Sequence, residues 1–182
     1  MKTLLKIVVV VLIVLGIWFL YNKTSKAPTA TDVTNQALLT HPDPSNATFD
    51  FEDGALTLKD GVNEKQVDKS SAVVETSLTD IVGFGDLNND KKEDAVVVLV
   101  QDGAGSGLFV YIAGFVSAPL KYFGTNAIFV GDRVEPKTIT IKNGLISLTY
   151  LDRRTNEPMS AEPTLSITKT YIYSKGLLVE VK

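Results

Sequence analysis

The feature that most constrains this chain is a series of short apolar runs, each closed by a turn signal, that begins at Asn46 and continues to the C-terminus. β-Branched and aromatic residues dominate these runs, which is typical of strands. No long stretch shows the 3.6-residue apolar period of an amphipathic helix. We therefore predict an all-β domain of eight to ten strands, arranged as an antiparallel sandwich or barrel, with room for one short helix in residues 63–75.

Hairpins are expected where turn residues separate two alternating runs. Within residues 47–59, Asp53-Gly54 separates ATFDFE from ALTLK, and Asp-Gly is a favoured hairpin turn. Two more hairpins are centred on Asn143-Gly144 and on residues 174–176. Residues 95–100 read AVVVLV and are apolar at every position, which predicts a strand buried on both faces.

The first 26 residues form a separate apolar segment. Residues 7–21 read IVVVVLIVLGIWFLY and carry no charge, while lysines flank them on both sides. This pattern predicts a membrane anchor or signal segment over residues 1–26. Pro28 spoils both candidate small-residue cleavage sites, so we expect an uncleaved single-pass helix in a membrane with the C-terminal domain outside the cytoplasm. Secretion after cleavage is the alternative.

The composition changes again after the apolar segment. Residues 27–45 are rich in Thr, Ser, Pro and Ala and predict a flexible tether with one turn of helix at 35–39. Residues 46–182 form the predicted extracytoplasmic β-rich domain. The first 26 residues hold four lysines and no acidic residue, so the formal charge of −3 for the whole chain becomes −7 for the remainder. An acidic body without a basic stripe argues against a nucleic-acid partner.

Residue counts exclude several kinds of site. The absence of cysteine excludes disulfide scaffolds, lipid-modified cysteine anchors, cysteine nucleophiles and thiolate zinc sites. The only histidine, His41, lies beside Pro42 and is expected to be solvated. The three arginines, Arg133, Arg153 and Arg154, have glutamates nearby in the sequence, and we expect ion pairs that hold loops. A shared anion-binding surface made by these arginines is the alternative.

One short segment has the spacing of a cation site. Asp86, Asn88, Asp90 and Asp94 place oxygen-bearing side chains at positions 1, 3, 5 and 9 of a loop, and Lys92 at position 7 has a carbonyl to offer. Calcium prefers six to eight oxygen ligands in a flexible arrangement. We therefore predict a calcium site with these five residues as ligands. The alternative is a solvated acidic turn whose Asx side chains accept hydrogen bonds from their own backbone.

The surrounding residues show which kind of calcium loop this segment is similar to. Val97 stands where an EF-hand has its glutamate, so the loop is not an EF-hand. Residues 82–98 resemble the calcium loop of FG-GAP repeats, in which GDxNxDxxxD joins two strands. The segment departs from that pattern at Lys91, where those loops usually have a glycine in a left-handed turn. The single copy excludes a β-propeller.

A wider resemblance covers about 46–182. The segments that carry it are GDLN at 85–88, GSGLFVY at 105–111, GTNAIFVGDR at 124–133 and EPMSAEP at 157–163. Together they look like a family of bacterial exported proteins and lipoproteins without an assigned activity. This resemblance implies a bacterial envelope location, with the predicted anchor in the inner membrane, and a compact domain of unassigned activity. It supplies no catalytic residue.

These observations lead to one expected function and two alternatives. We expect a calcium-stabilised binding or structural module of the bacterial envelope, tethered to the membrane by its N-terminal helix, with an envelope protein or a glycan as partner. An exported hydrolase or glycan-processing enzyme that uses paired carboxylates is one alternative. An exported inhibitor that inserts residues 102–107 into a foreign active site is the other.

Overall fold

A computed structural model describes residues 41–67, 69–103, 105 and 107–181, and His41–Lys182 forms one compact unit. The described residues contain twelve strands, rather than the eight to ten predicted, and no helix, which confirms the all-β prediction. The predicted anchor at 1–26 and the helical turn at 35–39 lie outside the described residues, and nothing described forms a helix able to cross a membrane. The strands are β1 (Thr48–Phe51), β2 (Gly54–Thr57), β3 (Val62–Gln66), β4 (Val73–Gly85), β5 (Asp94–Asp102), β6 (Leu108–Ser117), β7 (Tyr122–Gly124), β8 (Ile128–Asp132), β9 (Glu135–Lys142), β10 (Leu145–Asp152), β11 (Leu165–Ser174) and β12 (Leu177–Val181).

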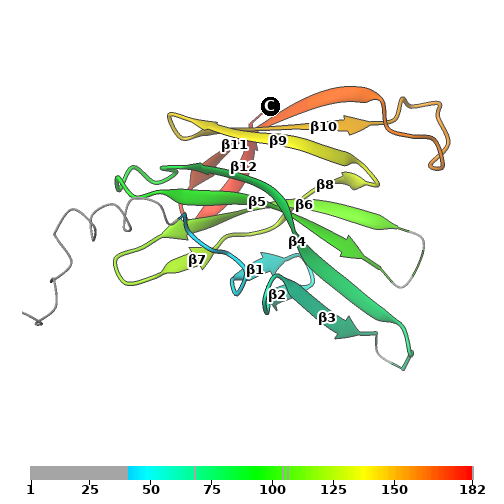
Figure 1. Cartoon of the computed structure of the whole chain (residues 1–182), viewed down its shortest axis with the longest axis horizontal. Helices are drawn as coiled ribbons and strands as arrows, with labels where there is room; N and C mark the ends of the chain where they lie inside the picture. Colours follow the sequence, from blue (N-terminus) through cyan, green and yellow to red (C-terminus); the bar gives the residue numbers. More distant parts are fainter. Residues whose placement is uncertain (1–40, 68, 104, 106, 182) are drawn as a thin grey trace, which may run out of the picture. The chain divides into compact units, whose positions relative to one another are not determined.

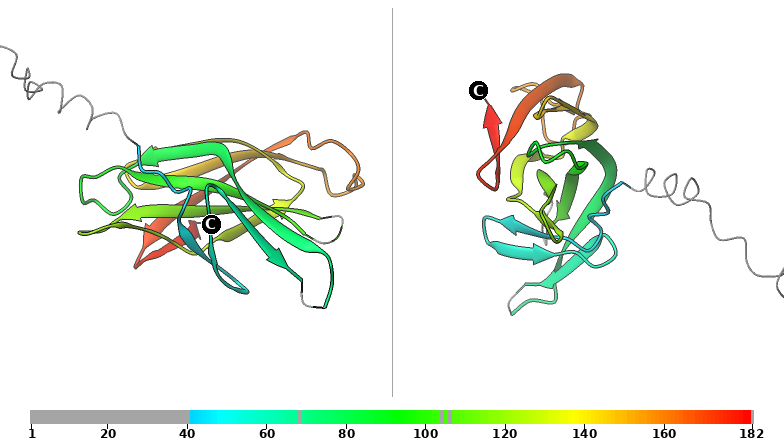
Figure 2. Two further views of the ribbon diagram at one scale, coloured as in Figure 1. Left: turned by 60° about the horizontal axis from the view of Figure 1, so that its bottom comes forward. Right: turned by 90° about the vertical axis from the view of Figure 1, so that its left-hand side faces the viewer.

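The strands form three antiparallel sheets (Figure 1). The largest has the order β3-β4-β5-β6-β7, and β8 also pairs with β6. A second sheet has the order β12-β11-β10-β9, and β1 and β2 form a separate hairpin. Seen from the end in Figure 2, the cyan hairpin, the green large sheet and the yellow-to-red second sheet lie in successive layers. The strand order was not predictable from the sequence pattern.

The larger hydrophobic cluster lies between the two larger sheets. It includes Val96 and Val98 of β5, and Ile146 and Leu148 of β10, all fully buried. The two sheets approach each other most closely where β4 crosses β9. A Cβ atom added to Gly83 would lie 2.4 Å from the Cγ2 atom of an isoleucine on β9, so only glycine fits there.

A smaller cluster lies on the opposite face of β5, beneath the β1–β2 hairpin. Phe49 and Phe51 of the hairpin pack with Val97 and Leu99, and three of these four side chains are fully buried while Phe51 is 7% exposed. Because β5 contributes alternate residues to both clusters, its predicted burial on two faces is confirmed. The hairpin is held at its edge by Gly124, where an added Cβ would lie only 2.1 Å from a backbone oxygen of β1.

The structure corrects the helix that the sequence left room for. Residues 63–75 contribute to β3 and to the start of β4, which pair with each other in an antiparallel ladder. Lys69 lies in the connection with a left-handed φ of 60°. Cross-strand pairing with a following valine-rich segment decides the conformation here, and a short polar stretch contains no sign of that pairing. The first hairpin turn is also displaced, with Glu52-Asp53 rather than Asp53-Gly54 between the paired strands.

Candidate functional site

Four of the five predicted ligand residues lie in the loop that joins β4 to β5, and the fifth, Asp94, is the first residue of β5. Asp86 accepts hydrogen bonds from the backbone N–H groups of Asp90 and Lys91, at 3.2 and 3.0 Å. The side-chain oxygen of Asn88 also accepts from Asp90 N–H, at 3.0 Å, and Asp90 Oδ1 accepts from Lys92 N–H, at 2.8 Å. Three of the five predicted ligands therefore turn their oxygens into one tight loop, where they meet backbone N–H groups.

The backbone at Lys91 is left-handed, although this chain has lysine where FG-GAP loops usually have a glycine. Lys91 has a φ of 67° and Asn89 a φ of 61°, both in the left-handed region. This region is uncommon for residues other than glycine, although asparagine tolerates it better than lysine. The hydrogen bond that the Lys91 N–H donates to the Asp86 carboxylate offsets the conformational cost at Lys91.

Asp94 has a different environment from the other predicted ligands. Its side chain is fully buried, and its two carboxylate oxygens accept the N–H groups of Leu87 and Ser117, at 2.7 and 2.8 Å. Both of these residues are themselves buried. In this arrangement the buried carboxylate and the two buried N–H groups are hydrogen-bond partners, so none of them is left unpaired. The role of Asp94 is therefore structural. Asp94 thus fastens the loop to the end of β6.

Two residues that the sequence analysis did not identify complete the loop. The Ser117 hydroxyl donates a hydrogen bond to Asp90 Oδ2 at 2.7 Å. The Ser117 backbone carbonyl accepts one from the Asn88 side-chain amide at 2.9 Å. The Tyr122 hydroxyl donates to the Glu93 carbonyl at 2.9 Å. The Ser117 hydroxyl, followed by the Lys92 N–H, holds the pKa of the Asp90 carboxyl below its usual value. No local signal could have identified these partners, because they lie 27 and 29 residues from the groups they bind.

The arrangement fits a cation only in part. Asp86, Asn88 and Asp90 are at least partly exposed and present oxygens from one loop. The Asp94 carboxylate is fully buried, and both of its oxygens accept buried N–H groups. The Lys92 ammonium donates to the Ala118 carbonyl at 3.3 Å, which places its charge beside the loop. Within residues 41–181, as far as they are described, no three acidic or histidine side chains gather closely enough to hold a metal ion. The calcium site stays a prediction.

His41 lies against the same loop. Its Nδ1 atom is 2.5 Å from Glu93 Oε2, and its ring stacks on Phe84 with 4.0 Å between the ring centroids. The side chain is still 58% exposed. The expectation of a solvent-exposed histidine is confirmed, and the contact with Glu93, 52 residues away in the sequence, is an addition to it.

The expected ion pairs are found in part, since Arg154 pairs with Glu157 and Arg133 with Asp132. Arg153 donates to the carbonyls of Ala161 and Arg133, at 2.6 and 2.8 Å. Arg154 donates to Glu157 from its guanidinium at 3.1 Å and from its N–H at 2.8 Å, and these contacts keep the pKa of Glu157 below its usual value. Arg133 and Arg153 line a surface hollow of about 620 Å³, and Arg154 does not take part in it.

Comparisons with models of protein families, with curated proteins and with solved structures gave no match. The likeness of the β4–β5 loop to an FG-GAP loop, and of the wider domain to bacterial exported proteins, therefore rests on the residues of this chain alone.

Proposed function

We propose that this protein is a membrane-tethered module of the bacterial envelope, whose extracytoplasmic β-domain binds another envelope component. The apolar residues 7–21, with lysines on both sides, support a single-pass anchor. The acidic remainder supports a protein or glycan partner rather than nucleic acid. Two open hollows in the described part of the chain suit surface binding.

The β4–β5 loop is the observation that carries the second part of this proposal, that calcium stabilises the domain. Asp86, Asn88 and Asp90 turn their oxygens into the loop, and Lys91 takes the left-handed conformation that such loops need. A calcium ion would take oxygens from these three side chains and fill its remaining positions with water. Asp94 would remain bound to β6. Binding of this kind is weak, with a Kd of about 10⁻⁴ to 10⁻³ M in extracellular modules.

Thermal unfolding of the full-length protein in detergent tests the calcium proposal. The unfolding temperature is measured in excess chelator, in about 5 mM calcium and in about 5 mM magnesium. A Kd in the stated range predicts a calcium-specific stabilisation of about 1 to 2 kcal/mol. Asp86→Ala combined with Asp90→Ala should abolish this response, and Asp80→Ala, an exposed acidic residue of β4, should leave it intact. An equal response in the double variant would place the ion elsewhere.

The hydrolase alternative receives no support from the hollow between β2 and β3. Two carboxylates line it, Asp53 and Glu64. Asp53 is paired with Lys65 at 3.3 Å, and its side chain is 70% exposed. The acid catalyst of a glycosidase is usually held in an apolar pocket beside its partner carboxylate. We therefore place the binding role first.

A further inference from the structure

The chain between β2 and β3 begins a hairpin that does not continue. Asp60 and Gly61 occupy a two-residue turn with left-handed φ values of 50° and 86°. Lys59 and Val62 exchange both backbone hydrogen bonds, at 2.8 and 3.1 Å. Beyond this one pair the strands separate, because β2 pairs with β1 and β3 pairs with β4. We call the open region between β2 and β3, residues 53–67, the fork.

The edge of β2 that faces the fork has no ladder. Leu58 N–H donates to the Ala47 carbonyl in line with the β1–β2 register. In an antiparallel ladder, alternate residues direct their N–H and C=O groups to the same side. The backbone groups of Ala55 and Thr57 therefore point away from β1 and toward the fork.

The same reasoning applies to β3, which is the edge strand of the large sheet. Leu78 N–H donates to the Gly61 carbonyl in line with the β3–β4 register. The backbone groups of Glu64 and Gln66 therefore point away from β4. A continued hairpin would pair Thr57 with Glu64, and the described residues form no such pair. Edge strands of this kind are templates for pairing with another chain.

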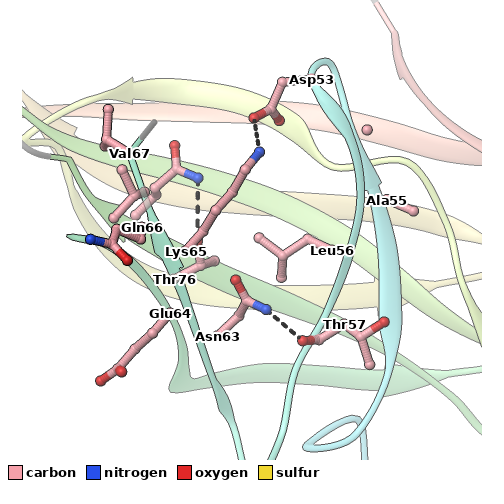
Figure 3. Close-up of a pocket in the computed structure, with 13 residues that line it drawn as sticks. Asp53, Ala55, Leu56, Thr57, Asn63, Glu64, Lys65, Gln66, Val67 and Thr76 are labelled. Carbon is pink, nitrogen blue, oxygen red and sulfur yellow. Dashed lines mark hydrogen bonds and ion pairs between the residues drawn. The ribbon is translucent and has the colours of Figure 1, made fainter. Parts of the chain in front are cut away.

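A cavity of about 590 Å³ lies in the fork (Figure 3). Its lining includes Val74 and Thr76 of β4 and Gln101 of β5, and the Gln101 amide donates to the Thr76 hydroxyl at 3.2 Å. The walls come from β2 and β3. At the bottom of the cavity the polar side chains of Thr76 and Gln101 thus bond to each other. The edges of β2 and β3 above them do not pair across the cavity.

Two weak contacts cross the fork. Asn63 donates its side-chain amide to the Thr57 carbonyl at 2.9 Å, near the closed end. The Lys65 ammonium lies 3.3 Å from Asp53 Oδ2, and the two side chains are 65% and 70% exposed. An ion pair this exposed contributes little to stability, so a ligand can displace it at small cost.

The charge beside the free edge identifies the kind of ligand. Glu64, Glu75 and Asp102 are cross-strand partners on β3, β4 and β5, so their side chains lie in one row on the same face. All three are exposed, and among the described residues none of them forms a salt bridge. Like charges in adjacent strands are destabilising, and a basic group placed beside them would remove that cost.

We propose that the free edge of β3 binds an extended, basic polypeptide segment of a partner protein as an added strand. Glu64 and Gln66 supply the backbone hydrogen bonds, as in β-strand addition. The ligand residue opposite Glu64 directs its side chain to the acidic row, and the residues on either side of it direct theirs into the fork cavity. The preferred ligand therefore alternates basic residues with small apolar ones. This inference rests on the proposed role as a binding module and does not require calcium.

Fluorescence anisotropy with labelled peptides of about seven residues tests the proposal. A peptide that alternates lysine and valine should bind the full-length protein, and binding should weaken in about 0.5 M salt. A peptide that alternates glutamate and valine should bind at least about tenfold more weakly, because it meets the acidic row. All titrations are run in chelator, so the outcome does not depend on the calcium proposal.

A matched pair of proline variants tests the edge itself. Glu64→Pro removes an N–H group that points away from β4, and it should weaken binding of the lysine–valine peptide about tenfold or more. Glu180→Pro makes the same change on β12, the edge of the other sheet. Its N–H also points outward, because Leu178, two residues before it on the same strand, directs its backbone groups away from β11 to Asn126. Binding should be unchanged in this variant.

Several results would overturn the proposal. These are no binding of the lysine–valine peptide to the native protein, equal binding of the two peptides, and an equal loss in Glu64→Pro and Glu180→Pro. Should Glu64→Pro fail to fold, Glu64→Lys combined with Glu75→Lys decides the question, because both side chains are exposed. This variant must lose the lysine–valine peptide and gain the glutamate–valine peptide, and the opposite result contradicts the proposal.

Discussion

The β4–β5 loop and the fork are both connections between strands, and they differ in whether their backbone groups have hydrogen-bond partners. In the loop, the N–H groups of residues 90, 91 and 92 each meet a side-chain oxygen of Asp86, Asn88 or Asp90. In the fork, the ladder stops after one pair, and no strand among the described residues takes up the edge of β3.

This difference separates structural polar groups from recognition groups. A backbone that is satisfied by its own side chains has a single preferred conformation and little to offer a partner. A backbone left open at a sheet edge keeps its hydrogen-bonding capacity for another chain. Substitutions in the loop should therefore affect stability, and substitutions in the fork should affect binding.

The largest expected effect is at Asp94, which holds the closed end of the loop. Asp94→Ala leaves the buried N–H groups of Leu87 and Ser117 without acceptors. An unsatisfied buried donor costs about 1 to 3 kcal/mol, so we expect the free energy of unfolding to fall by about 3 kcal/mol or more. Urea denaturation monitored by circular dichroism measures the change.

The matched substitution in the fork is Glu64→Ala. Its side chain is exposed, and the change should alter the free energy of unfolding by no more than about 0.5 kcal/mol. Equal losses in the two variants would contradict the division of roles between loop and fork.

A smaller effect is expected where the hairpin that forms one wall of the fork is attached. In Gly124→Ala the new Cβ would lie 2.1 Å from the Thr48 carbonyl oxygen, so β1 must move. Overpacking of this kind costs about 1 to 3 kcal/mol. Hydrogen exchange should show faster exchange in β1 and β2, while the N–H of Lys92 in the loop keeps its protection.

Gly103→Ala is the control for this substitution, since an added Cβ there makes only an ordinary contact at 3.6 Å with the Phe109 ring. It should leave exchange in both regions unchanged. Faster exchange at Lys92 in Gly124→Ala would show that hairpin and loop unfold as one unit.

The parts of the fold that the sequence predicted are those set by local pattern. The alternation around Asn143-Gly144 predicts a hairpin, and the two residues adopt left-handed φ values of 52° and 73° in the structure. The all-apolar run at 95–100 predicts a strand buried on two faces, because no polar position is left to face water. The spacing in 86–94 predicts a loop whose Asx oxygens turn inward, as Asp86, Asn88 and Asp90 do.

The parts that sequence reasoning missed depend on competition between distant partners. Ser117 reaches the loop only because β6 pairs beside β5, and nothing near residue 117 indicates this. The fork exists because β2 finds β1 and β3 finds β4, although Asp60-Gly61 alone favours a continuous β2–β3 hairpin. A helix at 63–75 does not form for the same reason, because β3 and the start of β4 pair with each other there.

The smallest expected effect is a pH dependence confined to the loop. Hydrogen bonds from the Ser117 hydroxyl and the Lys92 N–H lower the pKa of Asp90 in the folded state below the ordinary value of 3.8. The folded state therefore favours the charged carboxylate. This contribution is fully present above about pH 4 and is lost as the pH falls through the lowered pKa. Urea midpoints of the native protein and of Asp90→Asn should differ at pH 6, and the difference should shrink as the pH falls below 3.8 and through the lowered pKa.

Asp53→Asn supplies the comparison with the fork. Asp53 is paired only with the exposed Lys65, so its loss should change the midpoint little at pH 6. Ser117→Ala tests the cause of the lowered pKa. Removing the hydroxyl donor should raise the pKa of Asp90 toward 3.8. NMR titration of the Asp90 carboxyl carbon measures this change. The backbone contacts of Ser117 with Asn88 and Asp94 persist in this variant, so it tests the hydroxyl alone. An unchanged pKa of Asp90 in Ser117→Ala would therefore contradict the Ser117 hydroxyl as the main cause of the lowered pKa.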